Sequence, residues 1–301
     1  MRDEGCGIPH TRTCPAATTL ASRHERRRPQ KFLSPRIVAR RCAGPPDALR
    51  HSVRVNLDLD VGELMPAILD LPDRKGQSPG VVLLHGLGSS KEQMMASIGR
   101  SLSNRGVASF AIDLPLEVGP TSGIAALVSR NPITLVEQWC LAVREAHYAV
   151  RYLAGHAAID PTRIGIAGYS LGAYLAVMVA ADNPVIRAVV LAAGGELPPE
   201  TPFEAVVRGF VDPRRAVGQL SGRPLLMVNG RHDQHVHPDL ASSLYEAASD
   251  PKEHLWYDGD HWPPPSVIDS TAEWLMRQLN GRRPQPRVRS RRSRTTAPTR
   301  S

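Results

Sequence analysis

A serine stands at the centre of a glycine-rich turn in the middle of the chain. Directly after the apolar run Ile164–Ala167 the chain reads Gly168-Tyr169-Ser170-Leu171-Gly172, and a segment rich in Ala, Val and Met follows. In so tight a turn between a strand and a helix, side chains at positions 168 and 172 would collide with neighbouring backbone. The turn lifts the serine hydroxyl out of the sheet, and the helix N-terminus below it favours negative charge. We therefore predict that Ser170 is a nucleophile; the alternative is an incidental serine in a structural turn.

A second glycine-rich turn follows another apolar run. Val81–Leu84 leads directly into His85-Gly86-Leu87-Gly88. Glycines at this place allow the backbone to fold close to a nucleophile, so that its N–H groups can point at an oxyanion. We expect the backbone N–H groups of Leu87 and Leu171 to be these donors. His85 itself is expected to be structural, beneath the loop.

An acid and a histidine follow the last two strand-like runs of the chain. Asp233 lies in the loop after Leu225–Val228, and His261 follows the next run, just before the last helical segment. We predict that His261 is the general base and that Asp233 orients its ring. Asp258 and Asp260 compete for the role of the acid. An aspartate adjacent to the histidine in sequence reaches its ring nitrogen poorly, so Asp233 is preferred.

The loop around Asp233 also carries three histidines, which raises a metal-dependent alternative. His232, Asp233, His235 and His237 could share one ion, whose bound hydroxide would replace the serine as nucleophile. His235 and His237 can equally be loop residues at the mouth of a serine-based site. The four cysteines contain no CxxC pair, so neither a disulfide framework nor a zinc-ligand spacing is indicated. We expect neither a metal nor a cofactor.

Strand-like and helix-like segments alternate along the chain, which indicates a mostly parallel sheet with helices on both faces. Unbroken apolar runs typical of buried parallel strands occur at 81–84, 107–112, 164–167, 188–193 and 225–228, with a weaker one at 254–257. Helical spacing is found at 91–104, 136–153, 171–181, 238–248 and 265–279. Segments 53–59 and 63–71 are predicted to be antiparallel strands at the N-terminal edge of the sheet. Such sheets bind ligands at the carboxyl ends of their strands, where all the residues above are found.

The net charge of +8 is concentrated at the ends of the chain. Residues 1–50 carry 11 Lys and Arg against 4 Asp and Glu, residues 281–301 carry 8 against none, and residues 51–280 therefore carry −7. We predict disordered basic tails at 1–50 and 282–301 and a catalytic domain at 51–281. Arg-rich tails suggest a second alternative, a non-catalytic nucleic-acid-binding protein. The acidic core, in a chain with only 5% aromatic residues, argues against it.

No apolar stretch approaches the roughly 18–20 residues that span a bilayer, and the N-terminus lacks an apolar segment behind its charges. We expect a cytoplasmic protein. Segments 115–132 and 194–219 should border the substrate pocket. The second contains an apolar stretch that is either a small lid helix or packed core: Phe203, Val206, Val207, Phe210 and Val211.

The segment from Asp160 to Ala173, which contains the serine turn, resembles the corresponding turn of serine-dependent α/β-hydrolases. The nearest branches are the dienelactone-hydrolase-like and prolyl-oligopeptidase-like esterases and peptidases, and the likeness covers about residues 51–281. The chain order of Ser170, Asp233 and His261 is the order of that fold. The resemblance implies a serine hydrolase that cleaves an ester, lactone or amide of a small-molecule acyl substrate without a cofactor. A carboxylesterase is the preferred form and a peptidase the alternative.

The sequence departs from those branches in two respects. Dienelactone hydrolases proper use cysteine where this chain has Ser170, which puts that substrate in doubt. No large propeller-like domain precedes the hydrolase-like region, which argues against a dedicated oligopeptidase.

Overall fold

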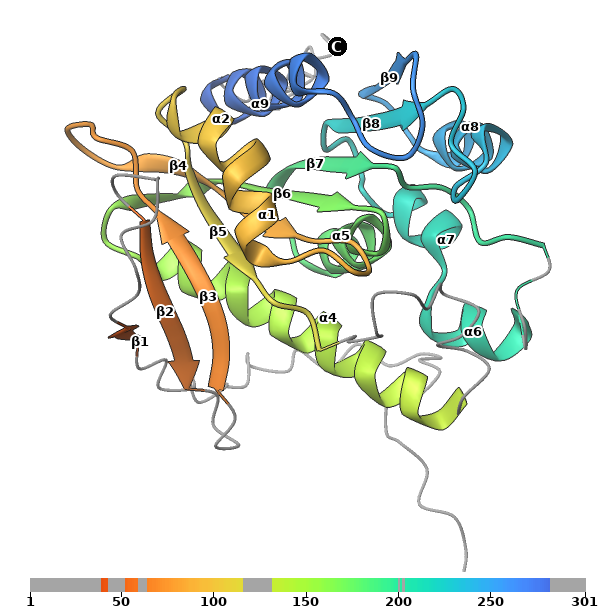
Figure 1. Ribbon diagram of the computed structural model, residues 1–301, viewed down its shortest axis with the longest axis horizontal. Helices are drawn as coiled ribbons and strands as arrows, with labels where there is room; N and C mark the ends of the chain where they lie inside the picture. The colour runs from red at the N-terminus through yellow and green to blue at the C-terminus, as the bar shows by residue number, and fades with distance from the viewer. Residues whose placement is uncertain are drawn as a thin grey trace, which may run out of the picture. The chain divides into compact units, whose positions relative to one another are not determined.

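A nine-stranded sheet forms the centre of the part of the chain that the structure describes, which comprises residues 39–42, 52–58, 64–115, 132–199, 201 and 204–281 (Figure 1). The structure is a computed structural model. The spatial order of the strands is β1-β2-β3-β5-β4-β6-β7-β8-β9. Their bounds are β1 Ala39–Cys42, β2 Ser52–Asp58, β3 Leu64–Asp70, β4 Ser78–Leu84, β5 Ala108–Ile112, β6 Ile159–Tyr169, β7 Ile186–Ala192, β8 Leu225–Gly230 and β9 Lys252–Tyr257.

The sheet is mixed, as predicted. Strands β5, β4, β6, β7, β8 and β9 pair in parallel, whereas β1, β2 and β3 extend the β5 edge in antiparallel pairs. All six parallel strands point their carboxyl ends at one edge of the sheet. The loops after β4, β6, β8 and β9, which carry the candidate site residues, therefore converge at that edge.

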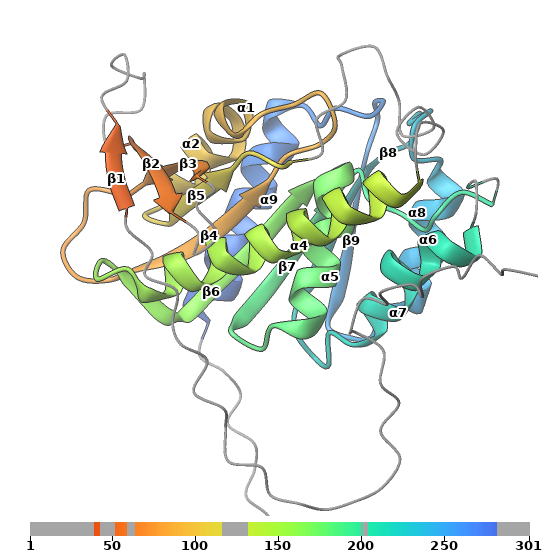
Figure 2. The ribbon, with the colours of Figure 1, turned by 90° about the horizontal axis from the view of Figure 1, so that it is seen from below.

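Helices cover both faces of the sheet. On one face lie α1 (Lys91–Met94), the π-helical turn η1 (Met95–Gly99), α2 (Arg100–Ser103) and α9 (Pro265–Asn280). The other face carries α4 (Pro132–Gly155), α5 (Leu171–Asp182), α7 (Pro213–Gly218) and α8 (Pro238–Ala247), and α6 (Glu204–Phe210) packs on α4. Figures 1 and 2 show α9 and α4 on opposite sides of the strands.

Two apolar cores result, one on each face of the sheet. In β4, Val82 and Leu84 face the core under α4 and α5, while Val81 and Leu83 face the core under α9. Because alternate residues of a strand point to opposite faces, a strand covered on both faces must be apolar throughout. This arrangement explains the unbroken apolar runs of the sequence.

Three local features differ from the sequence-based expectation or extend it. Residues 39–42 lie within the segment expected to be a disordered tail, yet they form β1 and pair with β2. The predicted helix 91–104 is present but is interrupted by η1. The apolar stretch near 207 forms α6, and Val207 and Val211 pack against the core. The remainder of both predicted tails, the segment 116–131 and Phe203 lie outside the described residues, as does the side chain of Val206.

Among the described residues, none of the helices combines the length and the apolar character needed to cross a membrane.

Candidate active site

Ser170 lies at the turn between β6 and α5 in a strained backbone conformation, with φ 51° and ψ −116°. A Cβ atom on Gly168 would come within 2.0 Å of the Gly172 carbonyl oxygen, and one on Gly172 would come within 2.2 Å of the Leu84 carbonyl oxygen. Both approaches are far below van der Waals contact, so only glycine fits at either position. The steric reason predicted for these two glycines is therefore confirmed.

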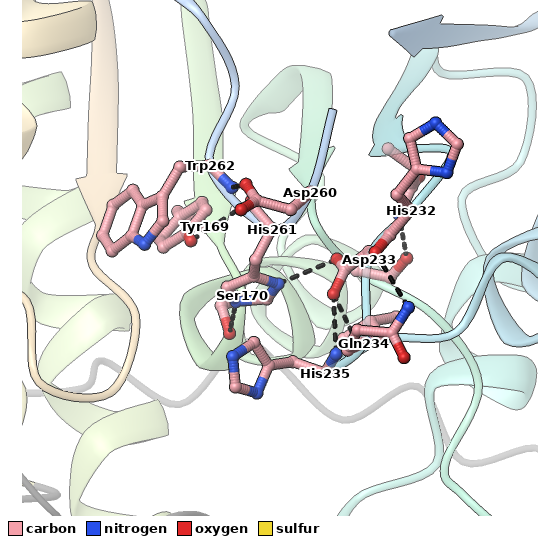
Figure 3. Close-up of polar contacts among 12 residues, drawn as sticks. Tyr169, Ser170, His232, Asp233, Gln234, His235, Asp260, His261 and Trp262 are labelled. Atoms are coloured by element: carbon pink, nitrogen blue, oxygen red, sulfur yellow. Dashed lines mark hydrogen bonds and ion pairs between the residues drawn. The ribbon is translucent and has the colours of Figure 1, made fainter. Parts of the chain in front are cut away.

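His261 connects Ser170 to Asp233 (Figure 3). Its Nε2 lies 3.0 Å from Ser170 Oγ, and its Nδ1 lies 2.8 Å from Asp233 Oδ2. Asp233 is fully buried, and the His261 side chain is 12% exposed. In the sequence, Asp233 is 28 positions and Ser170 is 91 positions from His261, and the structure brings the three side chains together.

The hydrogen bonds of Asp233 determine which ring nitrogen of His261 carries a proton. Asp233 Oδ1 accepts from the backbone N–H groups of His235 and Val236 at 2.8 and 2.9 Å. Burial alone would raise the pKa of Asp233, but the bond from His261 and these two amides outweigh it and hold the pKa below its ordinary value. An ionised carboxylate can only accept, so His261 Nδ1 donates to it, and Nε2 is left to accept the Ser170 hydroxyl proton.

The loop that carries His261 is fixed by contacts to its backbone. The Tyr257 hydroxyl donates to the carbonyl oxygens of Asp260 and His261 at 2.8 and 3.2 Å, and the Tyr169 hydroxyl donates to the His261 carbonyl at 3.3 Å. A Cβ atom on Gly230, at the end of β8, would come within 2.0 Å of the Asp260 carbonyl oxygen. The strand that leads to Asp233 therefore packs directly against the loop that carries His261.

Of the two expected oxyanion donors, Leu171 directly follows Ser170 and Leu87 lies in the loop after β4. Among the turn and loop hydrogen bonds of the described residues, none is donated by the Leu87 or the Leu171 backbone N–H. The loop that carries Leu87 approaches the nucleophile closely, because a Cβ atom on Gly86 would lie 3.0 Å from Ser170 Cβ. That these two amides bind an oxyanion stays a prediction.

His85 has a structural role, as expected. Its Nδ1 donates to the Gly86 carbonyl oxygen at 2.8 Å, and its Nε2 accepts from the Leu114 backbone N–H at 3.0 Å. Burial lowers its pKa, which favours the neutral ring that these two bonds require. His85 thereby fastens the glycine-rich loop to the segment after β5.

The competing acids make other contacts. Asp258 pairs with His232 at 2.8 Å, with both side chains exposed, and Asp260 Oδ1 accepts from the Trp262 backbone N–H at 3.2 Å. Of the acids near His261, Asp233 is the one whose carboxylate bonds to its ring.

Three of the four residues of the metal alternative have separate partners, and the fourth, His235, meets the His261 ring edge-on. Asp233 bonds to His261, His232 pairs with Asp258, and His237 lies 3.4 Å from Asp239. Within the described ranges, no group of three or more His, Cys, Asp or Glu side chains is arranged to hold one ion.

Comparison with known proteins identifies the family. Residues 81–298 match the sequence profile described as "Alpha/beta hydrolase family". The chain belongs to this family. A polyketide transferase, ATR5, from the fungus Stachybotrys chlorohalonatus is 33% identical over 117 residues, which are 39% of this chain and 36% of that protein. The uncharacterized protein Rv2307c of Mycobacterium tuberculosis is 26% identical over 202 residues, 64% of this chain and 66% of that protein. The chain thus matches about a third of the length of the first relative and just under two thirds of the second.

Solved structures support the same fold for this alpha/beta hydrolase. Acetyl xylan esterase 1 from Thermoanaerobacterium has a TM-score of 0.63 at 15% identity, over 83% of this chain and 89% of that one. A 2,6-dihydroxy-pseudo-oxynicotine hydrolase has a TM-score of 0.58 at 24% identity, over 75% of this chain and 68% of that one. At such identities the likeness extends to the fold alone.

The alpha/beta hydrolase site also contains two aromatic residues, Tyr169 and Trp262, that were not predicted from the sequence. The Tyr169 ring lies 5.2 Å from the His261 ring and stacks on Trp262 at 4.4 Å, between ring centroids. The exposed His235 ring meets His261 edge-on at 4.8 Å. The sequence positions of Tyr169 and Trp262 were a usable signal, because Tyr169 directly precedes Ser170 and Trp262 directly follows His261.

Proposed function

We propose that this protein hydrolyses a carboxylic ester, a lactone or a related acyl bond through an acyl-enzyme on Ser170. The observation that carries the proposal is the unbroken hydrogen-bonded line from buried Asp233 through His261 to the strained Ser170. Nucleophile, base and orienting acid lie within hydrogen-bond reach of one another, which is the geometry that nucleophilic acyl transfer requires.

In the first half of the reaction, Ser170 Oγ attacks the carbonyl carbon of the substrate and its proton passes to His261 Nε2. The carbonyl oxygen becomes an oxyanion, which accepts from the backbone N–H groups of Leu87 and Leu171. When the tetrahedral intermediate collapses, the bond to the leaving oxygen breaks and that oxygen takes the proton from His261. The acyl group remains on Ser170.

In the second half, water attacks the acyl-enzyme while His261 Nε2 accepts its proton. Collapse of the second intermediate returns this proton to Ser170 Oγ and releases the carboxylic acid. Asp233 keeps Nδ1 protonated throughout and stabilises the positive charge that His261 carries in each intermediate. The low pKa of Asp233 suits this role, because the carboxylate stays ionised.

Acyl transfer to an alcohol is a second candidate, and the polyketide transferase among the relatives favours it. The acyl-enzyme is the same in both reactions, and only the nucleophile that resolves it differs. Product analysis in the presence of a small alcohol separates the two, since transfer yields a new ester and hydrolysis yields the free acid.

The proposal is tested with 4-nitrophenyl acetate and a panel of lactones and aminoacyl amides. We expect a burst of nitrophenol followed by a slower steady state, as an acyl-enzyme forms and decays. Ser170→Ala should lower kcat by about 10⁴–10⁶. Ser221→Ala is a matched control, because Ser221 is also a serine with a φ of 51° but lies in the loop before β8, at the opposite edge of the sheet. Equal rates in the two variants would refute the proposal.

A further inference from the structure

A cavity of about 490 Å³ lies beside the nucleophile strand, on the α9 side of the sheet. Residues near the carboxyl ends of β6, β7 and β8 form its floor, α1 and η1 form one wall, and the start of α9 forms the other. The residues that define these surfaces include Ala96, Ile98, Val190, Val228, Trp262 and Ile268. Tyr169 also lines the cavity, but Ser170, Asp233 and His261 do not. The cavity is therefore separate from the three residues of the reaction centre, but it shares Tyr169 and Trp262 with the site around them.

The lining of the cavity selects for an uncharged ligand. None of the described lining residues carries a formal charge. Ser89 donates its hydroxyl to Gln93 Oε1, Ser97 donates to the Gln93 carbonyl, and Thr271 donates to the Val267 carbonyl, at 2.7, 2.7 and 2.8 Å. These hydroxyl protons are already used, so the surface offered to a ligand is mainly apolar.

The size of the cavity is that of a small-molecule site. Ligand pockets in proteins are commonly roughly 300–1,000 Å³ and predominantly apolar. Water finds few hydrogen-bond partners on this surface, so an apolar occupant gains from filling it.

Two features of the walls support a binding role. Trp262 is 58% exposed although it is a large aromatic side chain, and it stacks on Tyr169 to form one side of the cavity. Another wall includes η1, a π-helical turn within an otherwise α-helical segment. Such turns are rare and are found frequently at functional sites.

We propose that this cavity binds an uncharged alkyl or aryl group between η1 and the Tyr169–Trp262 pair. The group is either the apolar part of an acyl substrate or a separate apolar molecule, and the chemistry of recognition is the same. Tyr169 contacts the His261 ring and donates to the His261 carbonyl. A molecule in the cavity therefore contacts a side chain that also fixes the loop carrying His261. Binding itself does not depend on the proposed function; only assignment to the substrate does.

The probe is N-phenyl-1-naphthylamine, an uncharged aromatic compound whose fluorescence rises in apolar surroundings. It is titrated into the full-length protein and into Ser170→Ala, and we expect one saturable site with equal affinity in both. Ala96→Phe places a ring in the cavity from the exposed face of η1 and should weaken binding by at least about tenfold, because the apolar contact area is lost. Ala157→Phe adds the same ring at an exposed position near the amino end of β6, outside the cavity, and should leave binding unchanged.

A second variant keeps the test decisive if Ala96→Phe does not fold. Trp262→Ala removes a mostly exposed ring and should also weaken probe binding by about tenfold, since half of the aromatic pair is lost. Absence of saturable binding would overturn the proposal. Equal affinities of the wild type, Ala96→Phe and Trp262→Ala would do the same.

The source of the group is distinguished by displacement in Ser170→Ala with 4-nitrophenyl octanoate and 4-nitrophenyl acetate. Release of the probe by the octanoate but not by the acetate shows that the cavity binds the acyl chain of the substrate. Retention of the probe at saturating octanoate assigns it to a separate molecule, and both results uphold the site. If the wild type hydrolyses no ester, the proposed function fails while the probe titrations still decide the present proposal.

Discussion

Two histidines lie at the carboxyl edge of the same sheet, His85 after β4 and His261 after β9. In each of them, both ring nitrogens form hydrogen bonds. His85 bonds to two backbone groups, the Gly86 carbonyl and the Leu114 N–H. His261 bonds to a buried carboxylate and to a serine hydroxyl. Backbone amides and carbonyls neither give up nor take protons near neutral pH, so His85 can only hold the loop in place. The partners of a histidine, rather than its position at the sheet edge, determine whether it can act as a base.

The largest expected difference between the two regions concerns turnover. His261→Gln should lower kcat by about 10⁴–10⁶, because no base remains for the Ser170 proton. His85→Gln should lower kcat by no more than about a hundredfold and reduce the melting temperature by about 3–10 °C, since a buried hydrogen bond is lost. Steady-state kinetics and thermal unfolding on both variants check this. A larger kinetic effect at His85 would reverse the assignment.

The next effect concerns Asp233, the acid whose carboxylate bonds to His261 Nδ1. Asp233→Asn should keep the fold but place an N–H donor or a weaker acceptor beside Nδ1, leaving the imidazole in the wrong tautomer. We expect kcat to fall by about 10³–10⁴. Asp260→Asn is the control, because Asp260 bonds to the Trp262 backbone N–H and not to the His261 ring. Loss of activity in Asp260→Asn with a fast Asp233→Asn would show that the acid has been misassigned.

A smaller effect is expected for the other histidines of the Asp233 loop. His235→Ala and His237→Ala should each change kcat by no more than about tenfold, whereas ligands of a catalytic metal would each be close to essential. His235 lies edge-on to His261, and His237 is exposed beside Asp239. EDTA should leave the rate unchanged. Loss of activity that zinc restores would instead support the metal alternative.

The smallest effect concerns stability and a third histidine, His254 on β9. Burial, with Arg231 nearby, lowers its pKa from 6.5 to about 4, and its Nε2 bonds to the Asn229 amide oxygen. The unfolded chain therefore binds more protons than the folded chain between pH 4 and 6.5. Stability should fall as the pH drops through this window, by at most about 1.4 kcal/mol per pH unit for one histidine. Chemical unfolding at several pH values should give a flatter dependence in His254→Gln; an unchanged slope would contradict the assignment.

Much of the fold could be predicted because its elements leave strong periodic signals. Each predicted parallel strand has a counterpart in the sheet, since burial on both faces demands runs such as Val81–Leu84. The helices α4, α5, α8 and α9 could be predicted because their apolar residues recur at helical spacing. β1 left no such signal, because a four-residue strand at the edge is held by backbone pairing and needs no apolar pattern.

The candidate site was predictable in its residue types and only partly in its surroundings. The glycines at 168 and 172 indicate the strained turn, because no other residue fits at these positions. The stacking of Tyr169 and Trp262, the edge-on approach of His235 and the cavity beside η1 depend on how distant segments pack. Single-sequence periodicity contains no information on such contacts.

The most direct test of the central claim is covalent labelling by an alkyl fluorophosphonate, followed by mass spectrometry of the intact protein and of its peptides. The account predicts one adduct, located on Ser170, with none in Ser170→Ala and much slower labelling in His261→Gln, where the hydroxyl is not activated. Labelling that persists at the wild-type rate in Ser170→Ala, or an adduct on another residue, would contradict it.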